Sequence, residues 1–563
     1  MSIGSLSPIS TPTCTDVIER IGIRTDLPPR RRHDLSSAVR RFCRLQNRPP
    51  HDVRADPMEL RHQLKQMSPI ITGLSPGGFR NFKSLLGKAL ITAGVTSVPR
   101  RSRTPLTPEW KQLLARIADR HQRYSLSHLA RYCSARDRLP ADIDNDVLAQ
   151  YGEDLISKSL LDRPKQAYRN ACLAWNMAVD TIAGWPQQRL TVPNHRRIYA
   201  RTLSAFPESF QSDVENYLRH LSGDDLLSEM AVGPVTPETL KGRRKQILAI
   251  ASALVEAGRD AQSIRSLADL VDPEAAKFTL TIIWNRLGQR KSGYLHNLAL
   301  LLVNLSRHWV KADSADLQRL RALRRRLNPG KAGMTESNRR KLLQFTDHAN
   351  VATLLQLPRK LVAEAVRRDR GGAAEAVAVQ SALAIALELA APLRIHTLAK
   401  LDLDQHVVRS RPGPRGVVHL VIPARDVKNR VPLELELPSR VVEIFDLYWK
   451  RFRQRLIGQP GNWVFPGRNG HKDCAGLSTQ ISQTIRKATG LQMHSHLFRH
   501  LAGFLILSRN PGEFETVRLL LGHRSIETTI AFYCGMQQAT AFRRYDEVIS
   551  EYLTAELNNY AES

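Results

Sequence analysis

The chain has little cysteine, and the few cysteines present do not form recognisable pairs. Only 6 of 563 residues are cysteine, no CxxC motif occurs, and the spacing suggests neither a zinc site nor a disulfide framework. No acidic cluster with metal-ligand spacing is evident either. We therefore expect no metal and no cofactor, and the cysteine usage fits a reducing cytoplasm.

The chain also lacks the apolar segments that secretion and membranes require. Its N-terminal region has no apolar core of a signal peptide, and no stretch approaches the roughly 18 uncharged apolar residues of a membrane span. We therefore expect neither a secretory leader nor a membrane-spanning helix.

Acidic residues are scarce relative to basic ones. There are 83 Lys and Arg against 53 Asp and Glu, which gives a net charge of +30 and a pI near 10.4. The basic residues are spread along the chain, which suits a polyanionic partner, most commonly nucleic acid. The alternative, a basic protein that is merely soluble, leaves this self-repelling excess without a counter-charge. Hydrophobic residues make up 42%, enough for sizeable cores in three or four domains.

The N-terminal half is predicted to be helical and to repeat itself. Residues 35–53 (LSSAVRRFCRLQNRPPHDV) align with 126–143 (LSHLARYCSARDRLPADI), and 79–90 align with 168–179, at an offset near 90 residues. Each copy predicts an amphipathic helix, a Pro/Asp turn, a short helix and a further amphipathic helix. A weaker third copy is predicted at about 238–310. The alternative is chance similarity among helical stretches.

Composition divides the chain into four expected parts. A Pro- and Arg-rich linker covers 97–110, a weaker boundary lies near 200–235, and 321–341 is strongly basic with a Pro-Gly turn. That basic stretch is either a solvated linker or a segment that tracks DNA phosphates. The expected parts are a helical module at 1–100, a second at 101–200, a helical domain at 225–325 and a C-terminal domain at 340–563.

The C-terminal domain is predicted to be mostly helical with one small sheet. Residues 373–394 form a largely apolar stretch, which predicts a helix buried on several sides. Residues 417–438 contain two β-rich runs with charged residues between them, which predicts a hairpin or a three-stranded edge sheet. The expected fold class is therefore mainly α with a small β-sheet, in a multidomain chain.

Four places in this domain hold side chains that a phosphodiester reaction needs. Arg394 follows the apolar helix, and an arginine entering an apolar segment needs a partner or an anionic ligand. Lys428 lies between the β-rich runs, where a hairpin tip can place its ammonium in a groove. Taken singly, each candidate also fits an ion pair, a solvated turn or a packing residue. The other candidates lie in two short motifs: His496 and Arg499, at i and i+3 on one helix face, and His523 and Tyr533.

The order and spacing of these residues resemble the tyrosine recombinases, the phage-integrase family. The family's arginine motif reads PLRIHTL here, its His-x-x-Arg-His motif is residues 496–500, and its Leu-Gly-His segment with a following Tyr is 521–533. Thr397 stands where an acidic residue is common, and Pro392 replaces the usual glycine. The resemblance covers about 340–560. The module upstream of it, at 225–325, is similar in position to the family's core-binding domain.

The resemblance implies an enzyme that breaks and rejoins DNA strands. Tyr533 would attack the phosphate and form a 3′-phosphotyrosyl link, and Arg394 and Arg499 would hold the phosphate oxygens with planar cationic forks. Lys428 would protonate the departing 5′ oxygen. The bond energy is kept in the link, so neither ATP nor metal is needed.

The two histidines have less definite roles. His523 would supply a further hydrogen bond to the phosphate. His496 would either take the tyrosine proton or hold the phosphate, and the sequence does not separate the two. The residues that read DNA bases are not identified, because no recognition helix stands out.

The implied partner is double-stranded DNA at specific recombination sites, with no membrane. The family implies a homotetramer on two duplexes, with partner recombinases or accessory proteins as a further option, in the bacterial cytoplasm at the nucleoid. Integration, excision, transposition and resolution are not separated, nor is cleavage in cis from cleavage in trans. The segment 541–563 would dock on a neighbour or pack on its own domain. Two other functions stay open: a non-catalytic helix-turn-helix regulator built on Gly522 and Ser525 as caps, and a type IB topoisomerase.

Overall fold

The computed structural model divides into two compact units, Met1–Pro193 with Gly333–Ser563, and Asn194–Ala332. The first unit contains three large hydrophobic cores and the second contains one. The predicted linker residues 97–104 and boundary residues 224–234 lie outside the described residues. The structure describes residues 11–67, 69–96, 105–193, 199–223, 235–330, 333–411, 417–428, 430–458 and 461–561.

Two of the three cores in the first unit belong to the two N-terminal helical modules, and these modules have matching turns. Each module has a 3-10 turn that begins with proline and ends with aspartate, η1 (Pro50–Asp52) and η2 (Pro140–Asp142). Just before these turns, Asn47 and Asp137 adopt left-handed conformations with φ of 53° and 52°, which their short polar side chains tolerate. The two turns lie 90 residues apart, which is the offset of the predicted repeat. The helices are α1 (Cys14–Gly22), α2 (Pro29–Leu45), α3 (Pro57–Gln66), α4 (Pro69–Thr72) and α5 (Pro76–Thr92), then α6 (Pro108–Ala115), α7 (Arg120–Ser134), α8 (Asn145–Lys158) and α9 (Pro164–Thr181).

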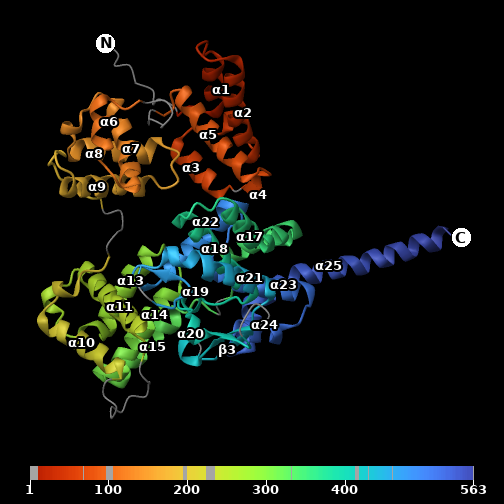
Figure 1. Ribbon diagram of the computed structural model, residues 1–563. Helices are drawn as coiled ribbons and strands as arrows, with labels where there is room; N and C mark the ends of the chain where they lie inside the picture. The colour runs from red at the N-terminus through yellow and green to blue at the C-terminus, as the bar shows by residue number, and fades with distance from the viewer. Residues whose placement is uncertain are drawn as a thin grey trace, which may run out of the picture. The chain divides into compact units, whose positions relative to one another are not determined.

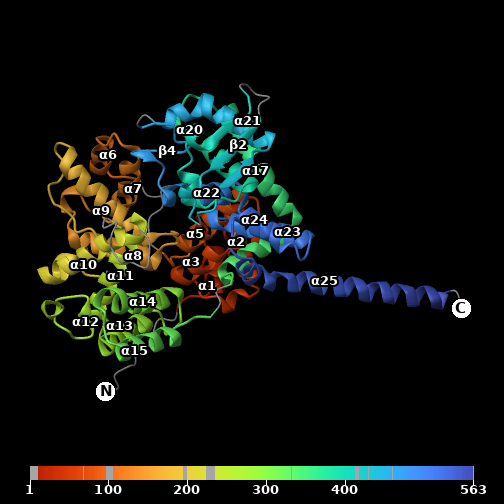
Figure 2. The same ribbon diagram turned by 90° about the horizontal axis from the view of Figure 1, so that it is seen from below.

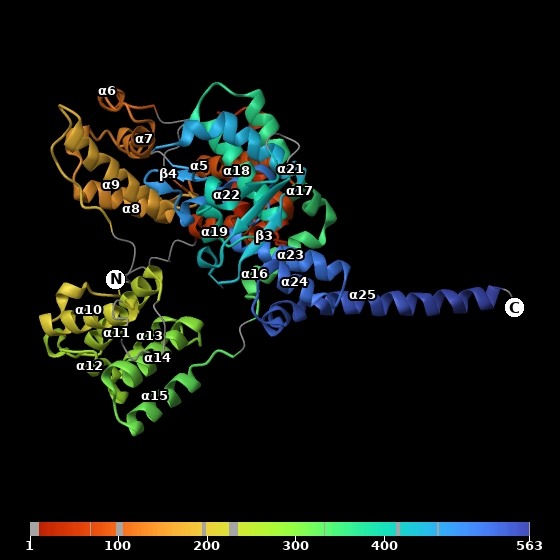
Figure 3. The ribbon, with the colours of Figure 1, turned by 60° about the horizontal axis from the view of Figure 1, so that its bottom comes forward.

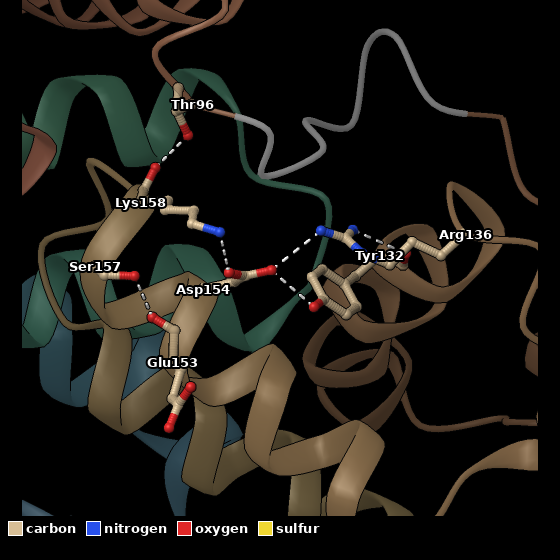
Figure 4. Close-up of polar contacts among 7 residues, drawn as sticks. All are labelled: Thr96, Tyr132, Arg136, Glu153, Asp154, Ser157 and Lys158. Atoms are coloured by element: carbon tan, nitrogen blue, oxygen red, sulfur yellow. Dashed lines mark hydrogen bonds and ion pairs between the residues drawn. The ribbon is translucent and has the colours of Figure 1, made fainter. Parts of the chain in front are cut away.

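A polar cluster fixes helices α7 and α8 of the second module (Figure 4). The Asp154 carboxylate accepts hydrogen bonds from Tyr132 Oη at 2.8 Å and Arg136 Nη2 at 3.0 Å, and Lys158 Nζ lies 2.7 Å away. The hydroxyl of Thr96, at the end of the first module, donates to the Lys158 carbonyl. The buried carboxylate is thus fully partnered, as a structural ion cluster requires.

The second unit is a helical bundle with its own core (Figure 3). This core begins at Phe206, upstream of the expected start at 225, and reaches Leu320. The predicted third repeat has an additional helix, α13, between its short helix and its last one. The expected linker at 321–341 is partly helical, since α15 runs to Arg326, and residues 331–332 lie outside the described residues. The helices are α10 (Glu208–Ser222), α11 (Pro237–Glu256), α12 (Ala268–Val271), α13 (Pro273–Arg286), α14 (Gly293–Asn304) and α15 (Ser314–Arg326), with η5 (Leu305–Val310) after α14.

The C-terminal domain is built around helix α18 (Ala373–Ala390), which α17, α21 and α22 cover (Figure 1). Among the described residues, α18 is the one helix long and apolar enough to cross a membrane, and 61% of it is buried inside the domain as core. The predicted buried helix is therefore present. The other helices are α16 (Glu336–Leu342), α17 (His348–Arg367), α19 (Ile395–Ala399), α20 (Leu403–His406), α21 (Ser439–Leu447), α22 (Cys474–Thr489), α23 (Ser495–Arg509), α24 (Phe514–Leu521) and α25 (Ile526–Ala561).

The main sheet of this domain has three antiparallel strands in the order β1-β2-β3: β1 (Val407–Arg409), β2 (Val418–Ile422) and β3 (Leu433–Glu436). Leu420 pairs with Val407 on one side and with Leu435 on the other. Alternate residues of β2 are buried, as expected for a sheet with one face on the core, and helix α20 lies beside this strand (Figure 2). Within the predicted range 417–438 the structure has two paired strands, β2 and β3, and the third strand of the sheet, β1, lies upstream of that range. A second, two-stranded sheet pairs β4 (Pro466–Gly467) with β5 (Gly470–His471).

Helices α24 and α25 meet at the glycine turn of the Leu-Gly-His motif. Gly522 caps α24 in a left-handed conformation with φ of 56°, which glycine adopts without strain. The Ser525 hydroxyl accepts from the Glu527 amide at 3.2 Å at the start of α25. Instead of a short second helix followed by a separate tail, α25 is one helix of 36 residues (Figure 1).

Candidate active site

Arg394 has no partner for its charge in the part of the chain that the structure describes. It is the N-cap residue of α19, directly after the segment that ends α18, and its side chain is half-buried. Among the described residues, none hydrogen-bonds or ion-pairs with its guanidinium, and burial lowers its pKa. A half-buried guanidinium in this state is ready to bind an anion.

Arg499 is buried on helix α23 and is held by two backbone carbonyls. Its Nη1 donates to the Pro392 carbonyl at 2.7 Å and its Nη2 to the Leu521 carbonyl at 2.5 Å. Burial, together with the charge of Arg394, lowers its pKa to about 10. The proline that departs from the family pattern therefore lies at a contact that orients Arg499.

Two histidines lie close to both arginines and remain neutral at pH 7. Burial lowers the pKa of His496, as do the charges of Arg499, Arg394 and Lys428. Burial and the same two arginines lower the pKa of His523 to about 4. The Nδ1 of His523 lies 2.9 Å from the Thr529 hydroxyl oxygen, which fixes the ring.

Lys428 is exposed in the turn between η7 (Ala424–Asp426) and strand β3. Its charge reaches His496, so the sheet brings this lysine to the cluster formed by α19, α23 and the α24–α25 turn. Five predicted residues thus gather around His496, which lies within electrostatic range of each of the other four. They are Arg394, Lys428, His496, Arg499 and His523.

Tyr533 lies beside this cluster, with its hydroxyl buried. The side chain is 1% exposed and packs in a small apolar cluster with Leu507, Val517 and Leu521. The hydroxyl donates to the Arg499 carbonyl at 3.1 Å, and burial raises its pKa. The predicted nucleophile therefore has to leave this site before it meets an external phosphate.

The Tyr533 ring fits because residue 503 of the facing helix α23 is glycine. A Cβ at Gly503 would lie 2.6 to 2.9 Å from three atoms of the Tyr533 side chain, closer than carbon atoms pack. His500, the second histidine of the motif, places its Nδ1 3.5 Å from the hydroxyl oxygen. Burial lowers the pKa of His500 to about 4.

Four residues at this site were given no role from the sequence. Thr529 and Gly503 give no signal that the sequence alone reveals, because their roles depend on how α25 packs on α23. His500 was identified only as part of the motif. Glu388 was visible as an acid within an apolar run, and the structure buries it without a hydrogen-bond partner among the described residues. Thr397, which stands where the family commonly has an acid, is buried and carries no charge.

The C-terminal region matches the phage integrase family over residues 344–539. No curated protein matches the chain. Solved structures similar to it include a lambda integrase dimer bound to a COC′ core site (13% identity, 57% of this chain and 93% of that chain, TM-score 0.32). Two others are XerH recombinase bound to difH substrate before cleavage (13%, 57% and 89%, TM-score 0.30) and the Tn1549 transposon integrase with circular intermediate DNA (16%, 57% and 93%, TM-score 0.31).

The family match confirms the resemblance of the C-terminal domain, and the mostly helical structure with its small sheet confirms the expected fold class. Residues 344–539 form a phage integrase domain, so this chain carries the catalytic domain of a tyrosine-type site-specific DNA recombinase. The small sheet and the helices around α18 belong to that domain.

Proposed function

We propose that this chain cuts and rejoins DNA at specific sites, with Tyr533 as nucleophile and a 3′-phosphotyrosyl intermediate. One observation carries the proposal: Arg394 and Arg499 lie with three further basic side chains in one cluster, and none of the described residues partners Arg394. A DNA phosphate supplies the missing negative charge. Charge that develops on its non-bridging oxygens during attack is stabilised by the two guanidiniums.

The proposed step forms one bond and breaks one bond at phosphorus. Tyr533 Oη attacks, the bond to the 5′ oxygen breaks, and the phenol proton passes to His496 or His523. Both histidines are neutral at pH 7 and are able to accept it. Lys428 supplies the proton for the departing 5′ oxygen. A 5′ hydroxyl from another strand reverses the step and completes the exchange.

The buried hydroxyl of Tyr533 implies a conformational step before cleavage. In this step the Tyr533 side chain leaves the Arg499 carbonyl and the small apolar cluster. The step occurs when DNA occupies the cluster of basic side chains around Arg394 and Arg499, here called the cation cluster. This burial also argues against a helix-turn-helix regulator, because the first turns of α25 pack Thr529 and Tyr533 inward, 0% and 1% exposed.

The proposed assembly is a homotetramer on two duplexes, and the end of α25 would join neighbouring copies. Phe542, Tyr545 and Tyr552 on this helix are 73%, 65% and 72% exposed, although each is a large hydrophobic side chain. The proposed setting is the bacterial cytoplasm, where the enzyme would integrate, excise or transpose a mobile element. Accessory proteins or partner recombinases would assist.

Formation of a covalent adduct tests the catalytic proposal. The protein is incubated with a nicked suicide duplex carrying its own element's end, and a protein–DNA adduct is sought on a denaturing gel. Tyr533→Phe is expected to form none. Tyr124→Phe, which removes an exposed hydroxyl from helix α7, is expected to behave as wild type. Absence of any adduct from the wild type would overturn the proposal, and efficient relaxation of unrelated plasmid would favour a type IB topoisomerase.

A further inference from the structure

Helix α2 of the first module has one side that is rich in arginine (Figure 1). Six of its 17 residues are arginine, and one, Asp34, is acidic. The opposite side packs into the module core, where Leu35, Val39 and Phe42 are fully buried. At 3.6 residues per turn, the exposed residues fall within about one third of the helix circumference. They are Arg30, His33, Ser37, Arg40, Arg41 and Arg44.

The four arginines of this exposed side, here called the α2 arginine stripe, have no counter-charge in the described residues. None of their guanidiniums forms a hydrogen bond or an ion pair there. The same module does pair an arginine where an acid is close, since Arg24 donates to both carboxylate oxygens of Asp26, at 2.6 and 2.7 Å. The stripe is therefore a surface of unpaired positive charge.

The stability of helix α2 is lowered by this arrangement. Its first turn contains Arg30 and no acidic residue, although the N-terminal end of a helix favours negative charge. Arg40 and Arg44 lie four residues apart, a spacing at which like charges repel along a helix face. A side that only faces water would be more stable with acids between these arginines. An external group with negative charge would offset both costs.

Exposed arginine recurs at matching places in the second module. Arg120 and Arg138 follow Arg30 and Arg48 by 90 residues, and all four are exposed. This is also the offset between the turns η1 and η2. The second module partners one more of its arginines, because Arg136 donates to the Asp154 carboxylate. The unpaired charge is therefore more concentrated on α2 than on α7.

We propose that the α2 arginine stripe is a second DNA-binding surface, separate from the cation cluster, and that it binds phosphates of duplex DNA. Arginine presents a planar fork that matches phosphate oxygens. Helix α2 has 17 residues, so it is about 25 Å long, which is the axial length of about 7 base pairs. A lipid surface fits less well, because none of the large hydrophobic side chains of α2 is exposed. The inference goes beyond the proposed function, since phosphate binding requires no cleavage.

The salt dependence of duplex binding by the full chain tests this surface. A variant with Arg40→Gln, Arg41→Gln and Arg44→Gln removes three charges from the exposed side of α2. The slope of log K against log salt concentration should fall by about 2.7, since each phosphate contact contributes about 0.9. The fall should be equal on the element's own end and on an unrelated duplex of equal length, because phosphates carry no sequence information. An unchanged slope, or a change confined to the element's own end, would overturn the inference.

A matched triple variant separates the stripe from net charge. It removes three exposed arginines that already have acidic partners, and it should keep the wild-type slope. The substitutions are Arg24→Gln, Arg189→Gln and Arg368→Gln, whose partners are Asp26, Asp180 and Glu364. Replacing the three α2 arginines by lysine keeps their charge and should also keep most of the slope. An equal loss of slope in either of these variants would overturn the inference.

Two further readouts define the ligand and the independence of the surface. At saturating duplex the α2 glutamine variant should form adduct at the wild-type rate, with a raised KM. A lower saturating rate would overturn a surface separate from the cation cluster. A larger change of slope on single-stranded RNA than on duplex DNA would overturn duplex DNA as the ligand. If wild type forms no adduct, the proposed function fails, and the salt slope still decides whether α2 binds DNA.

Discussion

Two polar clusters lie toward the two ends of helix α18, and they differ in whether their polar and charged side chains have hydrogen-bond partners. At one end, Lys472 Nζ donates to Gln380 and Gln480, and Tyr448 Oη donates to the Val464 carbonyl at 3.0 Å. At the other end, Arg394 has no partner among the described residues, and Glu388 has none either.

This difference separates a cluster that stabilises the fold from one that awaits a ligand. Buried polar groups with complete hydrogen bonding rigidify a core. Buried charges without partners weaken it and are kept where function needs them. We therefore expect substitutions at the first end to change stability and substitutions at the second to change catalysis.

Arg499→Lys gives the largest expected effect at the catalytic end. Lysine keeps the charge but loses the planar fork, so adduct formation should fall about 10²- to 10³-fold in a single-turnover assay. DNA affinity should change little, because the phosphate still meets a cation.

The control for this substitution is Arg455→Lys, whose guanidinium is bonded to the Asp369 carboxylate at 2.6 Å, away from the cation cluster. It should leave the adduct rate unchanged. If both variants slow the reaction equally, the contrast between the clusters is lost.

Lys472→Met is the reciprocal test at the structural end. It removes the donor of the Gln480 side-chain oxygen and one of the two donors of the Gln380 oxygen, which keeps the Gln480 amide at 3.2 Å. The free energy of unfolding should therefore fall by about 1–3 kcal/mol in a denaturant titration. The adduct rate of folded protein should not change. Lys487→Met, on the exposed face of α22, is the matched control and should be near neutral. A slower reaction at unchanged stability would place Lys472 in the catalytic set instead.

Gly503→Ala probes the burial of Tyr533. The new methyl group would lie 2.6 Å from the Tyr533 ring, so the ring must move, and stability should fall by about 1–3 kcal/mol. Spectrophotometric titration should then show the pKa of one tyrosine returning toward its ordinary value. Gly242→Ala adds the same methyl on α11, where nothing lies within 4 Å, and should cause no loss. An unshifted tyrosine titration would mean that Gly503 does not hold the ring.

The pH dependence of stability gives the smallest expected effect. The pKa of His500 is lowered to about 4 in the folded protein, so the unfolded chain binds the extra proton first as the pH falls. The stability contribution is therefore present above about pH 6.5, the ordinary histidine pKa, and is lost as the pH falls toward 4. His500→Asn should show a shallower decline in melting temperature over that range. Parallel curves would contradict the burial of His500 as the cause.

The sequence predicted much of the catalytic domain because its signals are local. The apolar run before Arg394 predicted helix α18, and the charged interval between β-rich runs predicted a sheet with Lys428 in a turn. The motif residues His496 to His500 lie in the first turns of one helix, and Gly522 ends another, as the sequence indicated.

The remaining features depend on packing between distant segments, which periodicity does not report. The contact of Tyr533 with Gly503 joins α25 to α23. The partnerless state of Glu388 is visible only when the surroundings of its side chain are known. The added helix α13 in the second unit and the single 36-residue α25 were not predicted, and α25 continues through Gly535, a residue that costs helix stability.

The most direct test of the central claim is to map the covalent link. The adduct trapped on a suicide duplex is digested with nuclease and protease, and the modified peptide is sequenced by mass spectrometry. We predict a 3′-phosphorylated nucleotide on Tyr533, within the peptide that contains Ser525 to Phe532. A nucleotide on any other residue, or a 5′-phosphate linkage, would contradict the proposed chemistry.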